Sequence, residues 1–180
     1  MAVKKQSCHL YCAIGTVLLL IVGLFVGSNY PIFKSASINL FNASTTTVAP
    51  QGEVTKLVAF VDSAAALVET EGENAFTQFR QQGGTFWQGD NYIFAYDMDG
   101  ATLVLPPTPN IEGTNRWNIQ DSNGVYFIQE MVNSLKNKES GWVSYSYPKP
   151  GAEIATPKLA YIKKVELGGK FIFVGSGMYY

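Results

Sequence analysis

The sequence predicts an α+β domain with a central antiparallel sheet, preceded by a hydrophobic segment and a linker. Apolar residues recur at three- and four-residue spacing over residues 53–80, which is the period of a helix. After residue 84 the chain changes to short alternating segments separated by Gly, Asp and Pro, which is typical of strands and turns. Strands joined by short turns pair antiparallel with their neighbours, so we expect about five to six antiparallel strands packed against one long N-terminal helix.

Composition narrows the function classes. The 180-residue chain is 47% hydrophobic, which is sufficient for a core, and its formal net charge of −1 gives no basic footprint for nucleic acid. The one histidine, His9, and the two cysteines, Cys8 and Cys12, all lie near the N-terminus. The rest of the chain therefore cannot form a histidine-based triad, a thiol nucleophile, a zinc site with N/S ligands or a disulfide. We expect no metal, no cofactor and no enzymatic activity.

The segment Leu10–Gly27 contains no charged side chain in its 18 residues. A helix of that length is about 27 Å long, close to the thickness of a bilayer core. Lys4 and Lys5 precede it, and positive charge marks the cytoplasmic side. We therefore expect residues 1–9 in the cytoplasm, residues 10–27 as a single-pass signal anchor in the cell membrane, and the rest outside. A cleaved signal peptide is the alternative.

Residues 28–50 are rich in Ser, Thr, Asn, Ala and Pro, a composition typical of an extracytoplasmic linker. Asn42-Ala43-Ser44 within it is an N-x-S sequon, so Asn42 is a candidate glycosylation site in a host that glycosylates. The folded domain is expected to fill residues 51–180.

The first helix of the domain is predicted over Glu53–Arg80, with a kink or split at Gly72 and an end at Gly83-Gly84. The predicted strands are Thr85–Gln88, Asn91–Asp97, Ala101–Leu105, Gly141–Pro148, Lys158–Glu166 and Lys170–Gly177.

A second helix is predicted between the third and fourth strands, from about Gly124 to Lys138, because apolar residues recur there at helical spacing. Asp121 or Ser122 is placed to cap it. Tight turns at Gly89-Asp90, Asp97–Gly100 and Leu167–Gly169 predict three hairpins.

The turn Asp97-Met98-Asp99-Gly100 is similar to the D-x-D-G-T motif of haloacid-dehalogenase-type phosphatases, in which the first Asp is the nucleophile. Ala101 stands where that motif requires Thr. The phosphatase fold also needs a parallel sheet alternating with helices and a later G-D-x-x-x-D pair, and the sequence predicts neither. We therefore interpret the two aspartates as turn residues.

Five parts of the domain share their order and spacing with a known family. They are Leu67–Phe76, Tyr92–Gly100, Asn110–Asn115, Gly141–Tyr145, and Tyr161–Val165 together with Val174–Gly177. Over about residues 51–180 the chain resembles the Cache family of extracytoplasmic sensory domains, in its single-module form. The resemblance implies a PAS-like sheet with the long helix behind it. It also implies a small-molecule pocket, often for a short carboxylate, on the sheet face away from that helix.

The chain departs from the family pattern at two places. Cache domains usually feed a second membrane helix and a cytoplasmic output domain, whereas this chain ends at Tyr180, directly after the last predicted strand. We therefore expect no output domain within it, and signalling through a separate partner protein. Leu105-Pro106 stands where similar sequences often carry His-Pro, which removes one polar group from the pocket or its loop.

The free face of the sheet supplies the candidate binding residues. Tyrosine and tryptophan combine an apolar body with a polar tip, which suits a small pocket with a few directed hydrogen bonds. The candidates are Tyr92, Phe94, Tyr96, Trp142, Tyr145 and Tyr161 as wall residues, and Arg116 and Lys158, beside Arg80, as cationic partners of a carboxylate. Tyr145 and Tyr147 share a face of their strand, and Trp142 lies on the opposite one. The alternative is that the aromatic residues only pack in the core and the cations lie in solvent.

Two functions follow from these expectations. The first is a membrane-anchored, extracytoplasmic module that binds or senses a small molecule. The second is a structural or adhesive cell-surface domain that binds no ligand.

Overall fold

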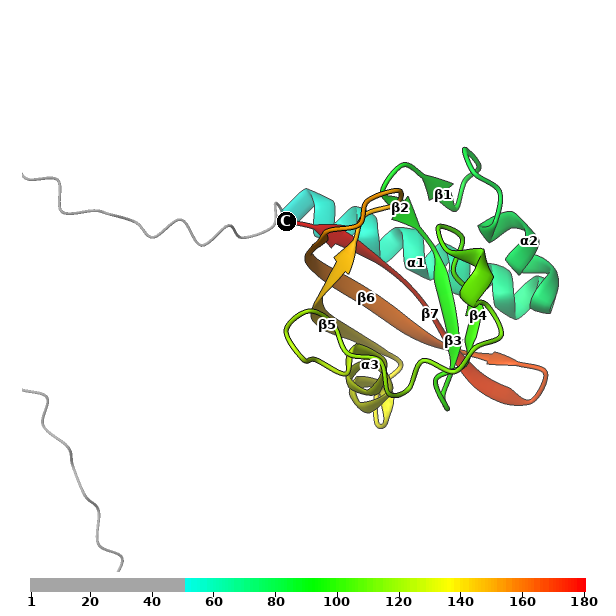
Figure 1. Ribbon diagram of the computed structural model, residues 1–180. Coiled ribbons are helices and arrows are strands. Elements are labelled where there is room, and N and C mark those ends of the chain that lie inside the picture. Colours follow the sequence, from blue (N-terminus) through cyan, green and yellow to red (C-terminus); the bar gives the residue numbers. More distant parts are fainter. Residues whose placement is uncertain (1–50) are drawn as a thin grey trace, which may run out of the picture. The chain divides into compact units, whose positions relative to one another are not determined.

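The computed structural model describes residues 51–180. The predicted membrane segment, the linker and Asn42 lie outside the described residues. The domain has a long helix α1 (Gln51–Glu71), a 3-10 turn η1 (Gly72–Asn74) and a short helix α2 (Ala75–Phe79), as Figure 1 shows. The split expected at Gly72 is confirmed, because its φ of +62° is incompatible with continuing the helix. Within this part of the chain, no helix is both long and apolar enough to cross a membrane.

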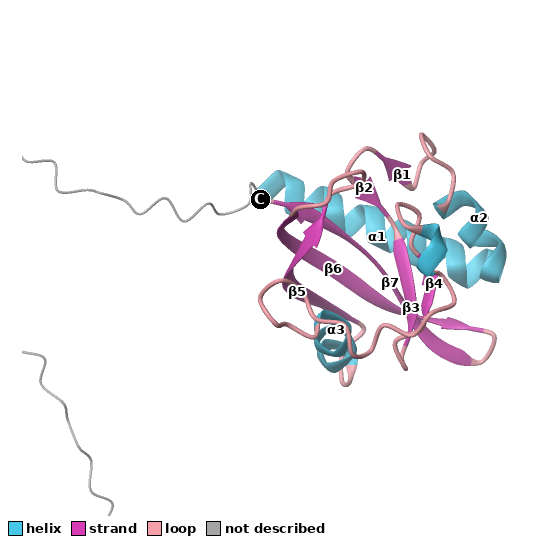
Figure 2. Cartoon of the chain, in the orientation of Figure 1, coloured by secondary structure: helices cyan, strands magenta, loops and turns pink. Residues whose placement is uncertain are grey.

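Five strands form one antiparallel sheet in the order β4-β3-β7-β6-β5, and two short strands form a separate pair, β1-β2 (Figure 2). The strands are β1 (Trp87–Gln88), β2 (Asn91–Tyr92), β3 (Phe94–Asp97), β4 (Thr102–Val104), β5 (Ser140–Pro148), β6 (Ala155–Leu167) and β7 (Lys170–Tyr179). A 3-10 turn η2 (Pro109–Ile111) and a helix α3 (Phe127–Leu135) lie between β4 and β5. The predicted α+β class and antiparallel sheet are confirmed.

The structure corrects three boundaries. The predicted strand Thr85–Gln88 is reduced to β1, which pairs only with β2 and does not join the main sheet. Strand β6 begins at Ala155, before the predicted Lys158, because it continues to pair with β5 as far as Pro148. Helix α3 is shorter than predicted, and its N-cap residue is Tyr126 rather than Asp121 or Ser122.

The sheet has a core on each face. Helix α1 packs against β6 and β7 on one face, and Phe76 and Phe79 of α2 join that core. Ile93 and Ala95 point into the same core. Helix α3 packs mainly on β5 on the other face, where Tyr92, Phe94 and Tyr96 belong to the same buried cluster as its apolar side chains. Because side chains alternate across a strand, the aromatic residues of β2 and β3 all point away from α1. The predicted separation of the two faces is therefore present.

Two glycines in β7 make room for large side chains on the α3 face. A Cβ at Gly175 would lie 2.6 Å from Cζ of Phe94 and 2.7 Å from Cγ2 of Ile162. A Cβ at Gly177 would lie 2.6 Å from Cε of Lys158. The Phe94 ring and the Lys158 side chain therefore lie flat across the backbone of β7, which a side chain at either glycine would prevent.

The turn between β3 and β4 is built by Asp97. Its Oδ1 accepts hydrogen bonds from the N–H of Asp99 (3.0 Å) and of Ala101 (2.7 Å). Gly100 has a φ of +91° and lies against the backbone of Trp117. Asp97 is thus engaged in the turn, and the neighbouring strands are antiparallel, unlike the parallel sheet that the phosphatase motif requires.

Candidate functional site

Lys158 is the only charged residue that is fully buried among residues 51–180, with an exposed fraction of 0%. It pairs with Tyr145 of β5 on one side and with Tyr179 of β7 on the other. Directly paired residues of antiparallel strands share a face, so both tyrosines flank the lysine on the α3 face of the sheet. The open space above Gly177 lets the lysine side chain reach towards β2.

Aromatic rings surround the Lys158 ammonium. Its Nζ lies 4.3 Å from the ring centroid of Tyr92, 4.8 Å from that of Tyr179, and 5.7 Å from those of Phe94 and Tyr147. A cation within about 6 Å of an aromatic centroid is attracted by the negative face of the ring. Across the described residues, no carboxylate lies within salt-bridge distance of this ammonium. The site is an aromatic cage around an unneutralised cation.

A chain of hydrogen bonds leads from Lys158 to the end of β5. Lys158 Nζ donates to the hydroxyl of Tyr92 at 2.9 Å, and that hydroxyl lies 3.5 Å from the hydroxyl of Tyr179. The Tyr179 hydroxyl donates to the carbonyl oxygen of Pro148 at 2.9 Å. Because Tyr179 uses its one proton on Pro148, the Tyr92 hydroxyl is the donor between the two tyrosines.

Burial is the main cause of the shifted pKa values of the side chains in this cage. Burial lowers the pKa of Lys158 to about 7 from its ordinary value of 10.5, although the more distant charge of Asp90 opposes the shift. Burial also raises the pKa of Tyr92, of Tyr145 and of Tyr147, and raises that of Tyr179 to about 12. The tyrosines therefore stay neutral near pH 7, while the lysine can change charge there.

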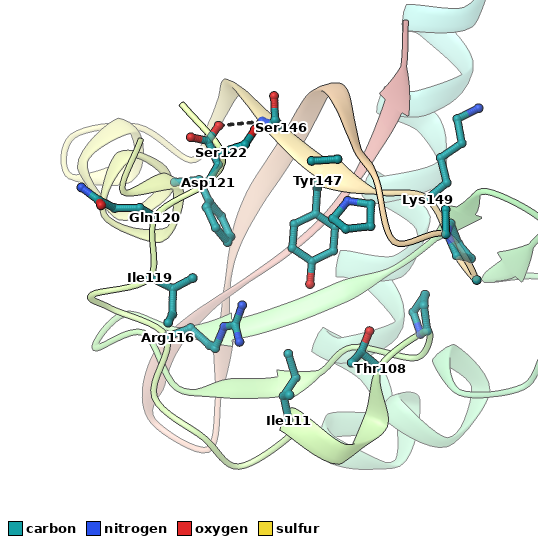
Figure 3. Close-up of a pocket in the computed structure, with 17 residues that line it drawn as sticks. Thr108, Ile111, Arg116, Ile119, Gln120, Asp121, Ser122, Ser146, Tyr147 and Lys149 are labelled. Atoms are coloured by element: carbon teal, nitrogen blue, oxygen red, sulfur yellow. Dashed lines mark hydrogen bonds between the residues drawn. The ribbon is translucent and has the colours of Figure 1, made fainter. Parts of the chain in front are cut away.

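A pocket of about 520 Å³ lies next to this cage, and of the cage residues Tyr147 alone lines it (Figure 3). It is formed by the loop after β4, by residues 116–122, by Phe127 at the start of α3 and by the end of β5 with its following loop. Tyr147 connects the two layers, because it lines the pocket and its ring also packs over Lys158. The volume is in the range of small-molecule sites.

Arg116 is the second cation of the site. It lines the pocket, and Figure 3 shows its guanidinium pointing towards the Tyr147 ring. Its Nε is buried without a hydrogen-bond partner, and in residues 51–180 no carboxylate lies within salt-bridge distance of its guanidinium. The charge of Arg116 acts to lower the pKa of Tyr96 and of Tyr147, against the larger effect of burial.

Asp121 fixes one wall of the pocket to the sheet. Its Oδ1 accepts hydrogen bonds from the N–H of Asn123 (2.8 Å) and of Val125 (2.9 Å), and its Oδ2 accepts one from the N–H of Ser146 (2.7 Å). Burial acts to raise the pKa of this carboxyl, but the N–H groups of Ser146, Val125 and Asn123 outweigh it, and the pKa is lowered. The carboxylate is thus committed to the loop rather than to a cation.

We expect Asp121→Ala to lower the free energy of unfolding by about 1–3 kcal/mol, because it leaves backbone N–H groups without an acceptor. Urea denaturation measures this, and Asp99→Ala, which removes an exposed aspartate with no side-chain acceptor role in the described hydrogen bonds, is the control. Because the folded pKa of Asp121 is depressed, its contribution is present above the unfolded pKa and is lost as the pH falls through the folded pKa. Equal stability of the two variants at neutral pH would contradict this role.

The structure brings six of the eight sequence-predicted residues together and separates two. Tyr92, Phe94, Tyr96, Tyr145 and Lys158 share the α3 face, and Arg116 lies above them. Tyr161 packs instead in the core beneath α1, and Trp142, 39% exposed, pairs with it at a centroid distance of 4.9 Å. The reason is strand parity, since Tyr161 is an odd number of residues from Lys158 and Trp142 is an odd number from Tyr145.

Arg80, the other cationic candidate, is already neutralised. Its guanidinium contacts the carboxylate of Glu112 at 2.8 Å and donates to the carbonyl of Leu103 at 3.1 Å. The other carboxylate oxygen of Glu112 accepts the N–H of Leu105 at 2.8 Å. Arg80 therefore anchors the loop after β4 beneath the pocket.

Sequence reasoning missed Tyr179 and Gly177 as members of the site, and it placed Tyr147 on the face of Tyr145 without naming it as a binding residue. A signal for Tyr179 was present, because Gly168 and Gly169 form a two-residue turn that pairs Leu167 with Lys170. Counting back from that turn pairs Lys158 with Tyr179.

The sequence matches the family described as Single Cache domain 2 over residues 61–179. This match spans more than half of the chain, and the chain belongs to the single Cache domain family. The sequence-based recognition is confirmed, and the domain is homologous to the sensory, ligand-binding domains of chemoreceptors and sensor kinases.

Two curated relatives illustrate this. The methyl-accepting chemotaxis protein McpP of Pseudomonas putida and the sensor histidine kinase MctS of Rhizobium johnstonii are each 31% identical to this chain over 90 residues, which is 50% of this chain. The matched region is 16% of the first relative and 19% of the second.

Solved structures of similar fold include a Cache chemosensory domain described as showing the structural basis for carboxylic acid recognition. It has a TM-score of 0.62 and 25% identity, and the alignment covers 71% of this chain and 93% of that one. A methyl-accepting chemotaxis protein from Vibrio parahaemolyticus has a TM-score of 0.60 and 22% identity, with 71% and 88% covered, and shares the fold.

Proposed function

We propose that this protein is a membrane-anchored, extracytoplasmic sensory domain that binds a short carboxylate on the α3 face of its sheet. The observation that carries the proposal is the Lys158 ammonium, which is fully buried and has no carboxylate partner in residues 51–180. A buried charge is costly unless it is paired, and a ligand carboxylate supplies the missing partner. The related Cache structure described for carboxylic acid recognition supports the same ligand class.

The cage explains how such a ligand is selected. Tyr92, Tyr145 and Tyr147 supply apolar walls with hydroxyl tips, and Lys158 supplies the charge. A short acyl chain suits these walls, while its carboxylate pairs with the ammonium. The Tyr147 ring both lines the pocket and lies 5.7 Å at its centroid from Nζ of Lys158, and in this proposal it moves aside to let the ligand reach the ammonium. No step of bond chemistry is part of this role, so the protein acts as a sensor and not as an enzyme.

The membrane setting of the proposal rests on the sequence. Leu10–Gly27 anchors the chain in the cell membrane, and Lys4 and Lys5 orient the domain outwards. The curated relatives are a chemotaxis receptor and a sensor kinase, which supports a sensory role at a membrane. Bound ligand is then reported to a separate signalling partner protein.

The test is calorimetric titration with acetate, propionate, butyrate and pyruvate, together with a thermal-shift series. Binding raises the free energy of unfolding by about 2.7 kcal/mol at a hundredfold excess over Kd, a readily measured shift. Formamide and propanol serve as neutral control compounds. No shift with any carboxylate would contradict the proposal and favour the structural or adhesive role.

Affinity is expected to fall as the pH rises above about 7. The free domain loses the Lys158 proton near pH 7, so binding above that pH must take up a proton, and Kd rises by up to about tenfold per pH unit. Between about pH 6 and 7, Kd changes little, and the surrounding tyrosines stay neutral because their pKa values are raised. Titrations in buffers of different ionisation enthalpy measure the proton uptake. A pH-independent Kd from 6 to 9 would show that Lys158 is not the carboxylate partner.

A further inference from the structure

The site holds two cations, rather than one, that have no carboxylate partner in residues 51–180. Nζ of Lys158 lies 5.7 Å from the centroid of the Tyr147 ring. Arg116 lines the pocket and points towards the same ring (Figure 3). Arg116 Nε is a buried donor with no acceptor, which is uncommon in folded proteins. The Lys158 ammonium and the Arg116 guanidinium therefore both lack an anionic oxygen as a partner within the described domain.

The other charged residues of the pocket do not supply an anionic oxygen to Lys158 or Arg116. The Asp121 carboxylate accepts three backbone hydrogen bonds, from Asn123, Val125 and Ser146. The third cation of the lining, Lys149, is already paired with Asp90 at 3.0 Å. Two positive groups in and next to the pocket, Lys158 and Arg116, are thus left without a paired carboxylate in the described part of the chain, and Tyr147 contacts both regions.

One carboxylate neutralises only one of these two groups. A guanidinium recognises a carboxylate through paired hydrogen bonds, whereas an ammonium acts as a compact point charge. A ligand that ends in an anionic group at both ends would pair with the ammonium in the cage and with the guanidinium in the pocket at the same time. The apolar rings between them suit a short carbon chain.

We propose that the preferred ligand is a short dicarboxylate, with one carboxylate on Lys158 and the other on Arg116. This inference rests on the proposed function, since it assigns a second anion subsite to the same pocket. Tyr147 lies between the subsites and must turn aside for one molecule to span them. Monocarboxylates then bind at Lys158 alone and more weakly.

The experiment compares the binding of succinate and butyrate by calorimetry at pH 7, with the full chain in detergent. Butyrate has the same number of carbons as succinate and one carboxylate fewer. Succinate is expected to bind at least about tenfold more tightly. Arg116→Gln is expected to weaken succinate binding by more than it weakens butyrate binding and so to remove this advantage, while Arg116→Lys restores part of it. Lys170→Gln, which removes an exposed lysine from the start of β7, is the control for net charge.

The outcomes separate this inference from the proposed function. Equal affinity for succinate and butyrate, or tighter binding of butyrate, would overturn the proposal of a dicarboxylate ligand. The proposal of a carboxylate sensor would then still hold. Binding of neither compound, with no response to acetate, propionate or pyruvate, removes both. The comparison of succinate with butyrate on the unaltered chain decides the matter even where Arg116→Gln fails to fold.

Discussion

Lys158→Met is expected to make the ligand-free protein more stable while it removes carboxylate binding. Methionine matches the length of the aliphatic stem and leaves no charge in the aromatic cage. Replacing buried charged groups by apolar ones is often stabilising, by about 1–4 kcal/mol. Loss of one partner of a buried charge pair weakens binding by about 2–5 kcal/mol, which is at least about thirtyfold in Kd. Opposite effects on stability and affinity are the signature of a residue kept for function.

The pH dependence of the free energy of unfolding tests the effect of the Lys158 charge on stability independently. Lys158 has its pKa lowered in the folded state to about 7 from 10.5, so the unfolded chain binds more protons between these values. Stability of the unaltered protein is therefore expected to rise with pH over that window, and the rise should be absent in Lys158→Met. Urea denaturation at several pH values measures both, with Lys170→Met as the control. A destabilised Lys158→Met variant would mean that the lysine is held by interactions stronger than those described.

Gly175→Ala is expected to lower the free energy of unfolding by about 1–3 kcal/mol, because the new methyl group overpacks the core. It would lie 2.6 Å from Cζ of Phe94 and 2.7 Å from Cγ2 of Ile162, both on the α3 face. Gly52→Ala is the matched control, since a Cβ there meets nothing within 4 Å and the residue lies in α1. That control is expected to be neutral or slightly stabilising.

A double variant identifies the clash as the cause. Phe94→Leu removes the ring atoms nearest to the added methyl group, so part of the loss at Gly175 should be recovered in the pair. The coupling is measured by a double-mutant cycle from urea midpoints at unchanged slope. Additive losses would show that Gly175 is required for its backbone and not for the space above it.

The elements could be predicted from the sequence because their signals are local. The helical period of α1, the Gly72 split and the Gly168-Gly169 hairpin are each decided by neighbouring residues, and the structure has all three. Boundaries were less predictable where a distant strand decides them. Strand β6 extends back to Ala155 because β5 pairs with it, and Asp121 binds the N–H of Ser146 in β5 instead of capping α3.

The sequence was sufficient to predict which face of the sheet carries the site, but not every residue that belongs to it. The alternation of Tyr92, Phe94 and Tyr96 sufficed to place them together, and Lys158 was named from its charge. Tyr161 was assigned without counting parity from Lys158, and it belongs to the other face. The burial of Lys158 depends on Gly177, in another strand, which leaves space for its stem.

The strand order has a consequence for how the domain is made. Strand β7 lies in the middle of the sheet between β3 and β6, yet it is the last strand in chain order. During synthesis the β3-β4 and β5-β6 hairpins can form early, but they cannot join until residues 170–179 have left the ribosome. Until then the edges of β3 and β6 are unpaired and open to association with other chains. The domain therefore closes in one late step, and a nascent chain cut short before β7 has no complete sheet.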